Sequence, residues 1–393
     1  MSAVMKLQPP EPSTADWHEL TRALGRRFGE RAADIDRDDR FVAENYAELK
    51  AYGFFAAGVP VELGGGGVDH AELGALLREL ARHDGSTALA FAMHTHQVAA
   101  AAWRWKHQKA PVDALLRRIA AEQTVLLSSG GSDWLQGSGK ATRVDGGFRI
   151  DARKIFASGA PAADLFVTTA VYDDPADGPT VLHFNVPMRA PGIRVLSTWR
   201  TLGMRGTGSH DVVFENVFVP DAAVALRRPR GRWHPAVHLA AMIAIPLIYA
   251  VYVGIAESAR DLALELAARR NADAHLADAA GSMDTALAGA RLALSDMFAA
   301  AAGNAPGAAT TNRVMLGRGL VVDAVLEVVE RALELGGGAA FYRDAGLERR
   351  FRDAQACRYH PLQERVQREY AGRIALGLDV DAPAGHAIRA AAP

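Results

Sequence analysis

The hydrophobic pattern of this sequence changes its period twice along the chain. In residues 1–122, and again in residues 233–393, apolar side chains recur every three or four positions, as in "HAELGALLRELARH" and "VVDAVLEVVERALEL". Residues 123–232 read instead as short alternating runs, and Asp145-Gly146 marks a tight turn within "ATRVDGGFRIDARK". A helix repeats every 3.6 residues and a strand every two, so one segment cannot satisfy both.

We therefore expect an α+β chain with three domains. The pattern predicts an N-terminal α-helical domain over residues 1–122, a middle antiparallel β-domain over 123–232, and a helical bundle over 233–393. Many short strands with polar turns favour an antiparallel sandwich or barrel in the middle domain. The arginine-rich stretch "LRRPRGRWHP", residues 226–235, is interpreted as a solvated linker, with a phosphate anchor as the alternative.

One apolar stretch is about as long as a membrane-spanning helix requires. It runs from Ala236 to Ala256, but it contains His238 and Pro246 and continues into the amphipathic "ESARDLALELAARR". We interpret it as a helix buried in a bundle and expect no membrane partner.

Charge and cysteine content narrow the function further. The chain has 44 Lys and Arg against 45 Asp and Glu, which argues against nucleic acid as a partner. Cys357 is the sole cysteine, so no internal disulfide or multi-thiolate metal site can form, and a cytoplasmic location is expected. His94 and His96 lie two apart on a predicted helix, point to different faces and cannot share a metal ion, so we expect no metal.

Five motifs occur in order along the chain. They are "YGFFAAGVPVELGGGGVD", "GSDW", "RKIFASGAPAADLFV", "LGMRGTGSHDVVFENVFVP" and "ELGGGAAFYRDAGLERRFRDA". Together they resemble the acyl-CoA dehydrogenase superfamily from about residue 15 to 378. That resemblance implies an N-terminal helical domain, a middle β-domain and a C-terminal four-helix bundle, with a flavin held between the last two and usually a homotetramer.

The resemblance also implies which residues bind FAD. Ser128 or Ser129 and Ser158 match hydroxyl contacts to the flavin ring, and Phe156 matches an aromatic contact. Ser132 would lie beside the pyrophosphate, and Arg270 corresponds to an arginine that reaches a neighbouring subunit's FAD. Glu334, Gly337 and Gly338 match a turn near the nucleotide.

Other interpretations of these residues remain open. Serine often ends a strand, and glycine often ends a helix. Asn271-Ala272-Asp273 replaces the Phe-Gly expected after Arg270, which puts the adenosine contact in doubt. The chain has no Gly-x-Gly-x-x-Gly between a strand and a helix, so a Rossmann site is not expected.

The catalytic carboxylate of a dehydrogenase is missing from this sequence. Its usual position, counted from Ala354, falls on Pro361, and the alternative position on the first bundle helix falls on about Ala244. A histidine, His360, stands beside Pro361. The flavin-dependent monooxygenases of the same fold resemble this chain at His360, at His94 and at the "GTGS" loop, residues 206–209. Arg352 and Asp353 are interpreted as a structural ion pair.

Two enzymatic functions and one non-enzymatic function follow from the resemblance. The first is a flavoprotein oxidoreductase that oxidises the CH–CH bond of an acyl-CoA or similar acyl substrate and passes electrons to an acceptor. The second is a two-component monooxygenase that takes FMN or another reduced flavin from a flavin reductase, with His94 and His360 as catalytic residues. The third is a non-catalytic flavin-binding scaffold. A small-molecule substrate, acyl-CoA or an apolar metabolite, and a homo-oligomer, either dimer or tetramer, are expected.

Overall fold

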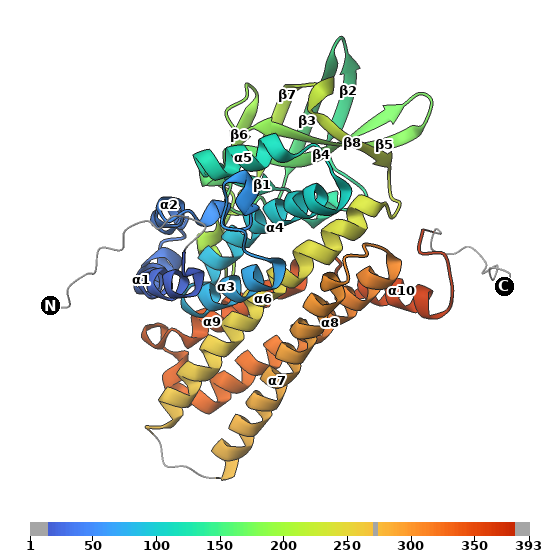
Figure 1. The fold of residues 1–393 in the computed structure, drawn as a ribbon. Helices are drawn as coiled ribbons and strands as arrows, with labels where there is room; N and C mark the ends of the chain where they lie inside the picture. The colour runs from blue at the N-terminus through green and yellow to red at the C-terminus, as the bar shows by residue number, and fades with distance from the viewer. Residues whose placement is uncertain (1–14, 270–273, 382–393) are drawn as a thin grey trace.

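The computed structural model describes residues 15–269 and 274–381, which form three parts (Figure 1). The N-terminal helices, drawn in blue, lie beside the green sheet, and the yellow-to-red C-terminal helices run beneath both. Helix α4 contacts strand β1 on one side and helix α6 on another. Helices give way to strands between Glu122 and Leu126, and strands to helices between Pro229 and Pro235. The predicted order of helices, strands and helices is confirmed.

Acidic side chains begin three of the N-terminal helices. Asp16 accepts a hydrogen bond from the Glu19 N–H, Asp69 from the Glu72 N–H, and Asp84 from the Ser86 and Thr87 N–H groups. Such caps satisfy backbone donors that a helix leaves unpaired. The helices are α1 (Trp17–Arg37), α2 (Ala43–Ala51), α3 (His70–His83), α4 (Gly85–Gln108) and α5 (Asp113–Glu122), with short turns at Phe54–Ala56 and Val61–Leu63.

The middle part is a mixed sheet in which antiparallel pairs predominate. Its order is β6-β7-β3-β2-β4-β5-β8, and β1 pairs with β4. The predicted turn joins β2 to β3, where Val144 pairs with Gly147. Two pairs, β1–β4 and β2–β4, are parallel. The chain between β1 and β4 contains β2 and β3, and the chain between β2 and β4 contains β3, which supplies the crossover that a parallel pair requires. The strands are β1 (Leu126–Ser128), β2 (Lys140–Val144), β3 (Gly147–Lys154), β4 (Leu165–Asp174), β5 (Gly178–Pro187), β6 (Ile193–Val195), β7 (Val212–Pro220) and β8 (Val224–Pro229).

The interpretation of residues 226–235 as a solvated linker was wrong for its first half. Val224–Pro229 forms β8, which pairs with β5, and Arg228 is only 1% exposed. Its guanidinium donates to the Leu135 carbonyl at 2.8 Å and to His183 Nε2 at 2.8 Å. A buried guanidinium needs partners for its donors, and Arg228 finds one of them in the loop after β1. Its hydrogen bond to that loop therefore helps to fix the position of the loop.

The apolar stretch after the sheet is the core helix of the C-terminal part. Helix α6 packs against α3, α4, α7, α8 and α9, and 94% of its most apolar window is buried. Each Leu, Ile or Val that it buries contributes about 1.5–3 kcal/mol to folding. This packing accounts for its hydropathy. The helices are α6 (Pro235–Ala267), α7 (Ala274–Ala302), α8 (Ala308–Gly336), α9 (Leu347–Ala354) and α10 (Glu364–Ala375), with 3₁₀ turns at Gly337–Phe341 and Gln355–Tyr359.

Candidate active site

The turn after β1 touches the segment that follows α9. A β-carbon added at Gly131 would lie 2.9 Å from Pro361 Cδ, and one added at Gly130 would lie 2.7 Å from the Ile155 carbonyl oxygen. The two glycines therefore let this turn pack between β3 and the chain at Pro361. The contact brings Ser128 and Ser129 to the same region as His360, although more than 220 residues separate them in the sequence.

His360 is held by a tyrosine from the apolar helix α6. Tyr252 Oη lies 2.6 Å from His360 Nε2, and Tyr252 is fully buried. Among the described residues the Tyr252 hydroxyl has no other acceptor, so it donates to Nε2 and the imidazole proton resides on Nδ1. Burial, the charge of Arg318 and His96 lower the pKa of His360 to about 3. His360 is therefore a neutral group that offers an N–H donor.

A buried arginine lies behind His360. Arg318, on α8, is 1% exposed and donates through Nη2 to the carbonyls of Arg358 and His360 at 3.3 and 3.2 Å. Its guanidinium carbon lies 5.5 Å from the ring centre of Tyr249, and its Nε has no hydrogen-bond partner in the described part of the chain. No carboxylate of the described residues pairs with it. Its positive charge therefore acts on the site and disfavours a second positive charge on His360.

His94 fastens helix α4 to its neighbours through both ring nitrogens. The Leu126 N–H donates to Nδ1 at 3.0 Å, so the ring proton resides on Nε2, which lies 2.8 Å from the Phe55 carbonyl. Burial lowers the pKa of His94 to about 4. Both ring nitrogens of His94 are hydrogen-bonded to backbone groups, which is typical of a packed structural histidine. Neither nitrogen is free for the predicted catalytic role.

His96 is the histidine of α4 that bears electrostatically on His360. A protonated His96 would lower the pKa of His360, and burial lowers the pKa of His96 itself to about 4. The Nδ1 atom lies 2.9 Å from the Ala92 carbonyl, so Nδ1 carries the proton and Nε2 offers a lone pair, 3.2 Å from Gln97 Nε2. The sequence-based prediction assigned the catalytic role to His94. His96 lies on a different face of α4, because a two-residue step turns a helix by about 200°.

Ser128 and Ser129 end β1 with different hydrogen bonding. Ser128 is 7% exposed, and its hydroxyl has no partner among the described residues. Ser129 Oγ lies 3.1 Å from Thr168 Oγ1, which donates to the buried Asp133. Because Thr168 has one hydroxyl proton, Ser129 must donate to it. Ser128 is thus left to bind a ligand.

A buried ion pair supports this turn from below. Lys154, on β3, is fully buried and donates to Asp133 Oδ2 at 2.7 Å and to the Ser138 carbonyl at 2.8 Å. Burial lowers the pKa of Lys154, and the charge of Asp133 opposes that change. The pair joins the turn at Gly131–Asp133 to the sheet. The predicted contact Ser132 lies in this turn, but its side chain lies outside what the structure describes.

Phe156 and Ser158 lie on the loop after β3. The Phe156 ring is 49% exposed, its residue has φ +54°, and Trp199 packs edge-on against it at 5.6 Å. Ser158 Oγ lies 2.8 Å from Ser209 Oγ in the "GTGS" loop. An exposed aromatic face beside a hydroxyl is the arrangement that a flat ring ligand requires.

The remaining predicted cofactor residues lie at the other end of α8. Glu334 follows Arg318 by 16 residues, which corresponds to about 24 Å along a helix. It pairs with Arg331 at 2.9 Å and with His275 at 3.5 Å, and Gly337 (φ +61°) ends the helix, as its glycine run predicts. Glu334, Gly337 and Gly338 therefore do not join the serine and histidine cluster within one subunit. Arg270 lies outside the described residues.

Neither position of a dehydrogenase base carries a carboxylate. Pro361 contacts Gly131, and Ala244 is a buried alanine of α6, 3% exposed. The nearby motif carboxylate, Asp353, accepts a hydrogen bond from the Met204 N–H, and burial raises its pKa to about 6. Arg352 pairs instead with Asp36 of α1 at 2.6 Å and with Glu348 of α9, so the interpretation of Arg352 and Asp353 as an ion pair was wrong about the partner.

A cleft of about 600 Å³ opens two helical turns from His96. Trp103, seven residues after His96 on the same face of α4, lines it with Ile243, the neighbour of Ala244. Lys106, His107 and Asp69 add polar groups to its wall. The cleft offers aromatic and charged contacts for a ligand that extends away from His96.

The residues of this site fit a flavin ring. They supply a hydroxyl at the largely buried Ser128, an exposed aromatic side chain at Phe156, a hydroxyl at Ser158, and two glycines that let the backbone turn closely. A buried cation at Arg318 suits a ligand whose reduced form carries negative charge. The contacts that a dinucleotide would need at its adenosine end are absent from the described residues of this cluster.

Three family models match the chain along its length. Residues 16–115 match the acyl-CoA dehydrogenase N-terminal domain, residues 128–217 the middle domain, and residues 247–364 an acyl-CoA dehydrogenase C-terminal domain. The matches follow the helical, sheet and helical parts in turn.

Proteins with similar sequences or structures span nearly the whole chain. L-evernosamine nitrososynthase from a Micromonospora species is 30% identical over 95% of this chain and 93% of its own. Amino sugar nitrososynthase RubN8 from Streptomyces rubradiris is 31% identical over 94% and 92%. A solved structure of KijD3 in complex with FMN and dTDP-3-amino-2,3,6-trideoxy-4-keto-3-methyl-D-glucose has a TM-score of 0.85 at 28% identity, over 94% of this chain and 96% of that one.

Proposed function

The chain belongs to the acyl-CoA dehydrogenase superfamily and is a flavin-dependent enzyme of that fold, and from this premise we propose that it is a monooxygenase. It takes reduced FMN from a separate reductase, uses oxygen, and oxygenates an amine nitrogen of a small polar molecule. The observation that carries the proposal is that Pro361 and Ala244 occupy both positions of the dehydrogenase base, while His360, bonded to Tyr252, stands beside Pro361.

A dehydrogenase and a monooxygenase require different chemical groups in this site. Removing a proton from the carbon next to a thioester requires a base that holds that proton, and a carboxylate of tuned pKa suits the task. His360 suits this task poorly, because burial and the charge of Arg318 lower its pKa to about 3 and make it a weak proton acceptor at neutral pH. As a neutral N–H donor it can instead hydrogen-bond an oxygen atom without releasing a proton to it.

The two histidines offer complementary atoms to an amine and to oxygen. Bound reduced flavin supplies the electrons that activate oxygen. His360 Nδ1 presents a proton, and His96 Nε2, which lies 3.2 Å from the Gln97 amide, would accept an N–H of the substrate in place of that amide. Burial favours the uncharged form of an amine bound there, because desolvation penalises charge. An uncharged amine has the lone pair that oxygenation of nitrogen needs.

The substrate class follows from the cleft and from the related proteins. The names of two relatives describe nitrososynthases, one of them acting on amino sugars, and the KijD3 structure contains a dTDP-linked amino sugar. The cleft at Trp103 and Lys106 provides aromatic and cationic contacts about two helical turns from His96. We infer an amino sugar joined to a nucleoside diphosphate, with the amine at the histidines and the nucleotide towards the cleft.

The proposal also specifies the cofactor and the assembly. FMN suits the cluster better than FAD, because Glu334 lies about 24 Å along α8 from Arg318 in the same subunit. We propose that the chain forms a homo-oligomer through α8, where Leu316 and Leu320 are 46% and 61% exposed one turn apart. A row of exposed leucines on one helix face is typical of a surface that a second copy covers.

A direct test compares two reactions of the same protein. Reduced FMN, oxygen and a panel of dTDP-amino sugars should yield products that contain one or more added oxygen atoms, as detected by mass spectrometry. His360→Ala should lower turnover at least tenfold while changing flavin affinity little, whereas the exposed His18→Ala on α1 should leave both unchanged. Equal turnover of His360→Ala and wild type would remove His360 from its assigned role.

Acyl-CoA oxidation stays as the second candidate, because it is the activity for which the superfamily is named. Anaerobic mixing of flavin-loaded protein with a panel of acyl-CoAs tests it. Bleaching of the bound flavin by an acyl-CoA would establish that candidate and overturn the monooxygenase proposal. Absence of bleaching, together with oxygen-dependent product from an amine, would support the proposal.

A further inference from the structure

Three hydroxyl groups beside the candidate ring site form a chain that ends on a backbone carbonyl. Ser158 Oγ lies 2.8 Å from Ser209 Oγ, which lies 2.6 Å from Thr207 Oγ1. Thr207 Oγ1 in turn donates to the Met204 carbonyl at 2.9 Å. Thr207 is fully buried, and Ser209 is 3% exposed. Water therefore has little access to the interior of this chain.

The carbonyl fixes the direction of every hydrogen bond in the chain. A carbonyl only accepts, so the single proton of Thr207 is committed to Met204. Ser209 must then donate to Thr207, since Thr207 has no proton left for it. Ser158 must for the same reason donate to Ser209. The Ser158 hydroxyl consequently has only its lone pairs to offer a ligand.

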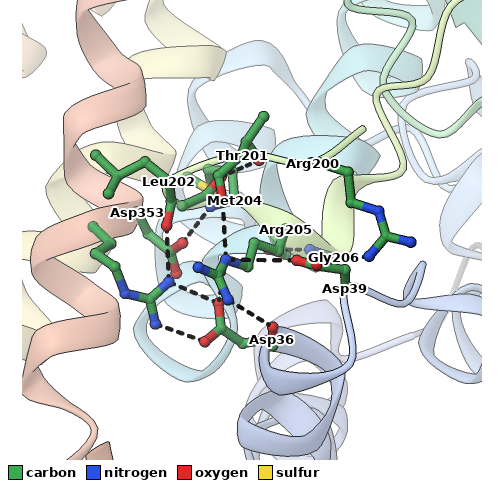
Figure 2. Close-up of polar contacts among 12 residues, drawn as sticks. Asp36, Asp39, Arg200, Thr201, Leu202, Met204, Arg205, Gly206 and Asp353 are labelled. Carbon is green, nitrogen blue, oxygen red and sulfur yellow. Dashed lines mark hydrogen bonds and ion pairs between the residues drawn. The ribbon is translucent and has the colours of Figure 1, made fainter. Parts of the chain in front are cut away.

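Met204, at the end of the series of hydroxyl groups, is held in place by Asp353 of α9. Asp353 accepts a hydrogen bond from the Met204 N–H, and Figure 2 shows Asp353 pointing at Met204 from the bundle side. The Trp199 indole also donates to the Met204 carbonyl, at 3.0 Å, and the Gly159 N–H donates to the Thr207 carbonyl at 2.8 Å. The loop that carries the chain is thus bonded to the bundle and to the Ser158 segment.

We infer that Ser209 and Thr207 are positioning residues that make Ser158 an obligate hydrogen-bond acceptor and thereby select the reduced state of the flavin. Reduced flavin carries an N–H on a central ring nitrogen where oxidised flavin carries a lone pair. An acceptor-only hydroxyl binds the N–H and repels the lone pair. This inference rests on the proposed function in placing Ser158 against the ring. It adds a reason why the protein would take the flavin in reduced form.

The affinities of the two flavin states provide the test. Oxidised FMN and dithionite-reduced FMN would be titrated anaerobically into the full chain, and the ratio of the two dissociation constants measured by calorimetry. Wild type should bind reduced FMN more tightly. Ser209→Ala and Thr207→Val each free the Ser158 proton, so each should shrink the ratio by about three- to tenfold, the range expected for one hydrogen bond.

Matched variants separate this effect from a general loosening of the loop. Thr207→Ser keeps the hydroxyl and should keep the ratio of wild type. Thr21→Val removes a buried hydroxyl that also donates to a carbonyl, but on α1, and should leave the ratio unchanged. A variant that merely disturbs packing would weaken both flavin states alike and leave their ratio intact.

The outcomes distinguish this inference from the proposed function. A wild-type ratio near one, or a ratio that survives Ser209→Ala and Thr207→Val, would overturn the inference whatever the enzyme oxygenates. A ratio that collapses in both variants would support it, even if no dTDP-amino sugar is oxygenated, in which case only the proposed substrate would fail.

Discussion

Replacing Asp353 by asparagine should stabilise the protein at neutral and alkaline pH while leaving it nearly unchanged in acid. Asp353 is 5% exposed, and burial raises the pKa of its carboxyl from 3.8 to about 6 in the folded protein. The folded chain therefore holds this proton over a pH range in which the unfolded chain has lost it. A group of this kind lowers the free energy of unfolding as pH rises from about 4 towards 7.

The size of the effect follows from the two pKa values. Each pH unit between 3.8 and about 6 corresponds to about 1.4 kcal/mol. The raised pKa of Asp353 therefore lowers the free energy of unfolding by about 3 kcal/mol at pH 8 and by about 1.6 kcal/mol at pH 5. Asparagine avoids this cost, and its carbonyl can still accept the Met204 N–H. The weaker, uncharged hydrogen bond offsets about 1 kcal/mol of the gain.

Urea denaturation at pH 5 and pH 8 measures this difference. The stability advantage of Asp353→Asn over wild type should widen by about 1.4 kcal/mol between the two pH values. The exposed Asp278→Asn on α7 is the matched control and should show no such widening. A constant difference between Asp353→Asn and wild type, or one that narrows with rising pH, would refute the reasoning.

Three further variants test other parts of the site. Lys154→Met should lower the free energy of unfolding by about 3–5 kcal/mol in urea denaturation, because it leaves Asp133 buried without a cation, and adding Asp133→Asn should restore much of the loss. Arg318→Met should raise the pKa of His360, read from an NMR titration of labelled histidine; an unchanged pKa would contradict the role given to that charge. Gly131→Ala should weaken FMN binding several-fold through its contact with Pro361, whereas Gly338→Ala, which meets open space, should not; equal effects would contradict the packing argument.

Much of the fold could be predicted because the responsible signals are local. The hairpin at Asp145-Gly146 and the end of α8 at its glycine run depend on residues next to each other in the sequence. The burial of α6 follows from its composition and its amphipathic continuation. The vacant base positions at Pro361 and Ala244 could also be read by counting from a motif.

The candidate site was predicted less completely because its decisive contacts are distant in sequence. Tyr252 and His360 are 108 residues apart, and no sequence pattern around either residue predicts their contact. A tyrosine in the most apolar helix was the available signal, since its hydroxyl had to find a partner there. The choice between His94 and His96 depended on which face of α4 meets the bundle.

The sequence by itself determined the three-part architecture, the flavin family and the loss of the dehydrogenase base, because periodicity, turn chemistry and motif spacing are properties of neighbouring residues. Only the tertiary structure decided which groups face the ligand and how their protons are arranged. Ser158, Ser209 and Thr207 gain a fixed donor order only when Met204 presents its carbonyl to them. A side chain's pKa and its donor direction depend on burial and on partners, and folding alone brings those partners together.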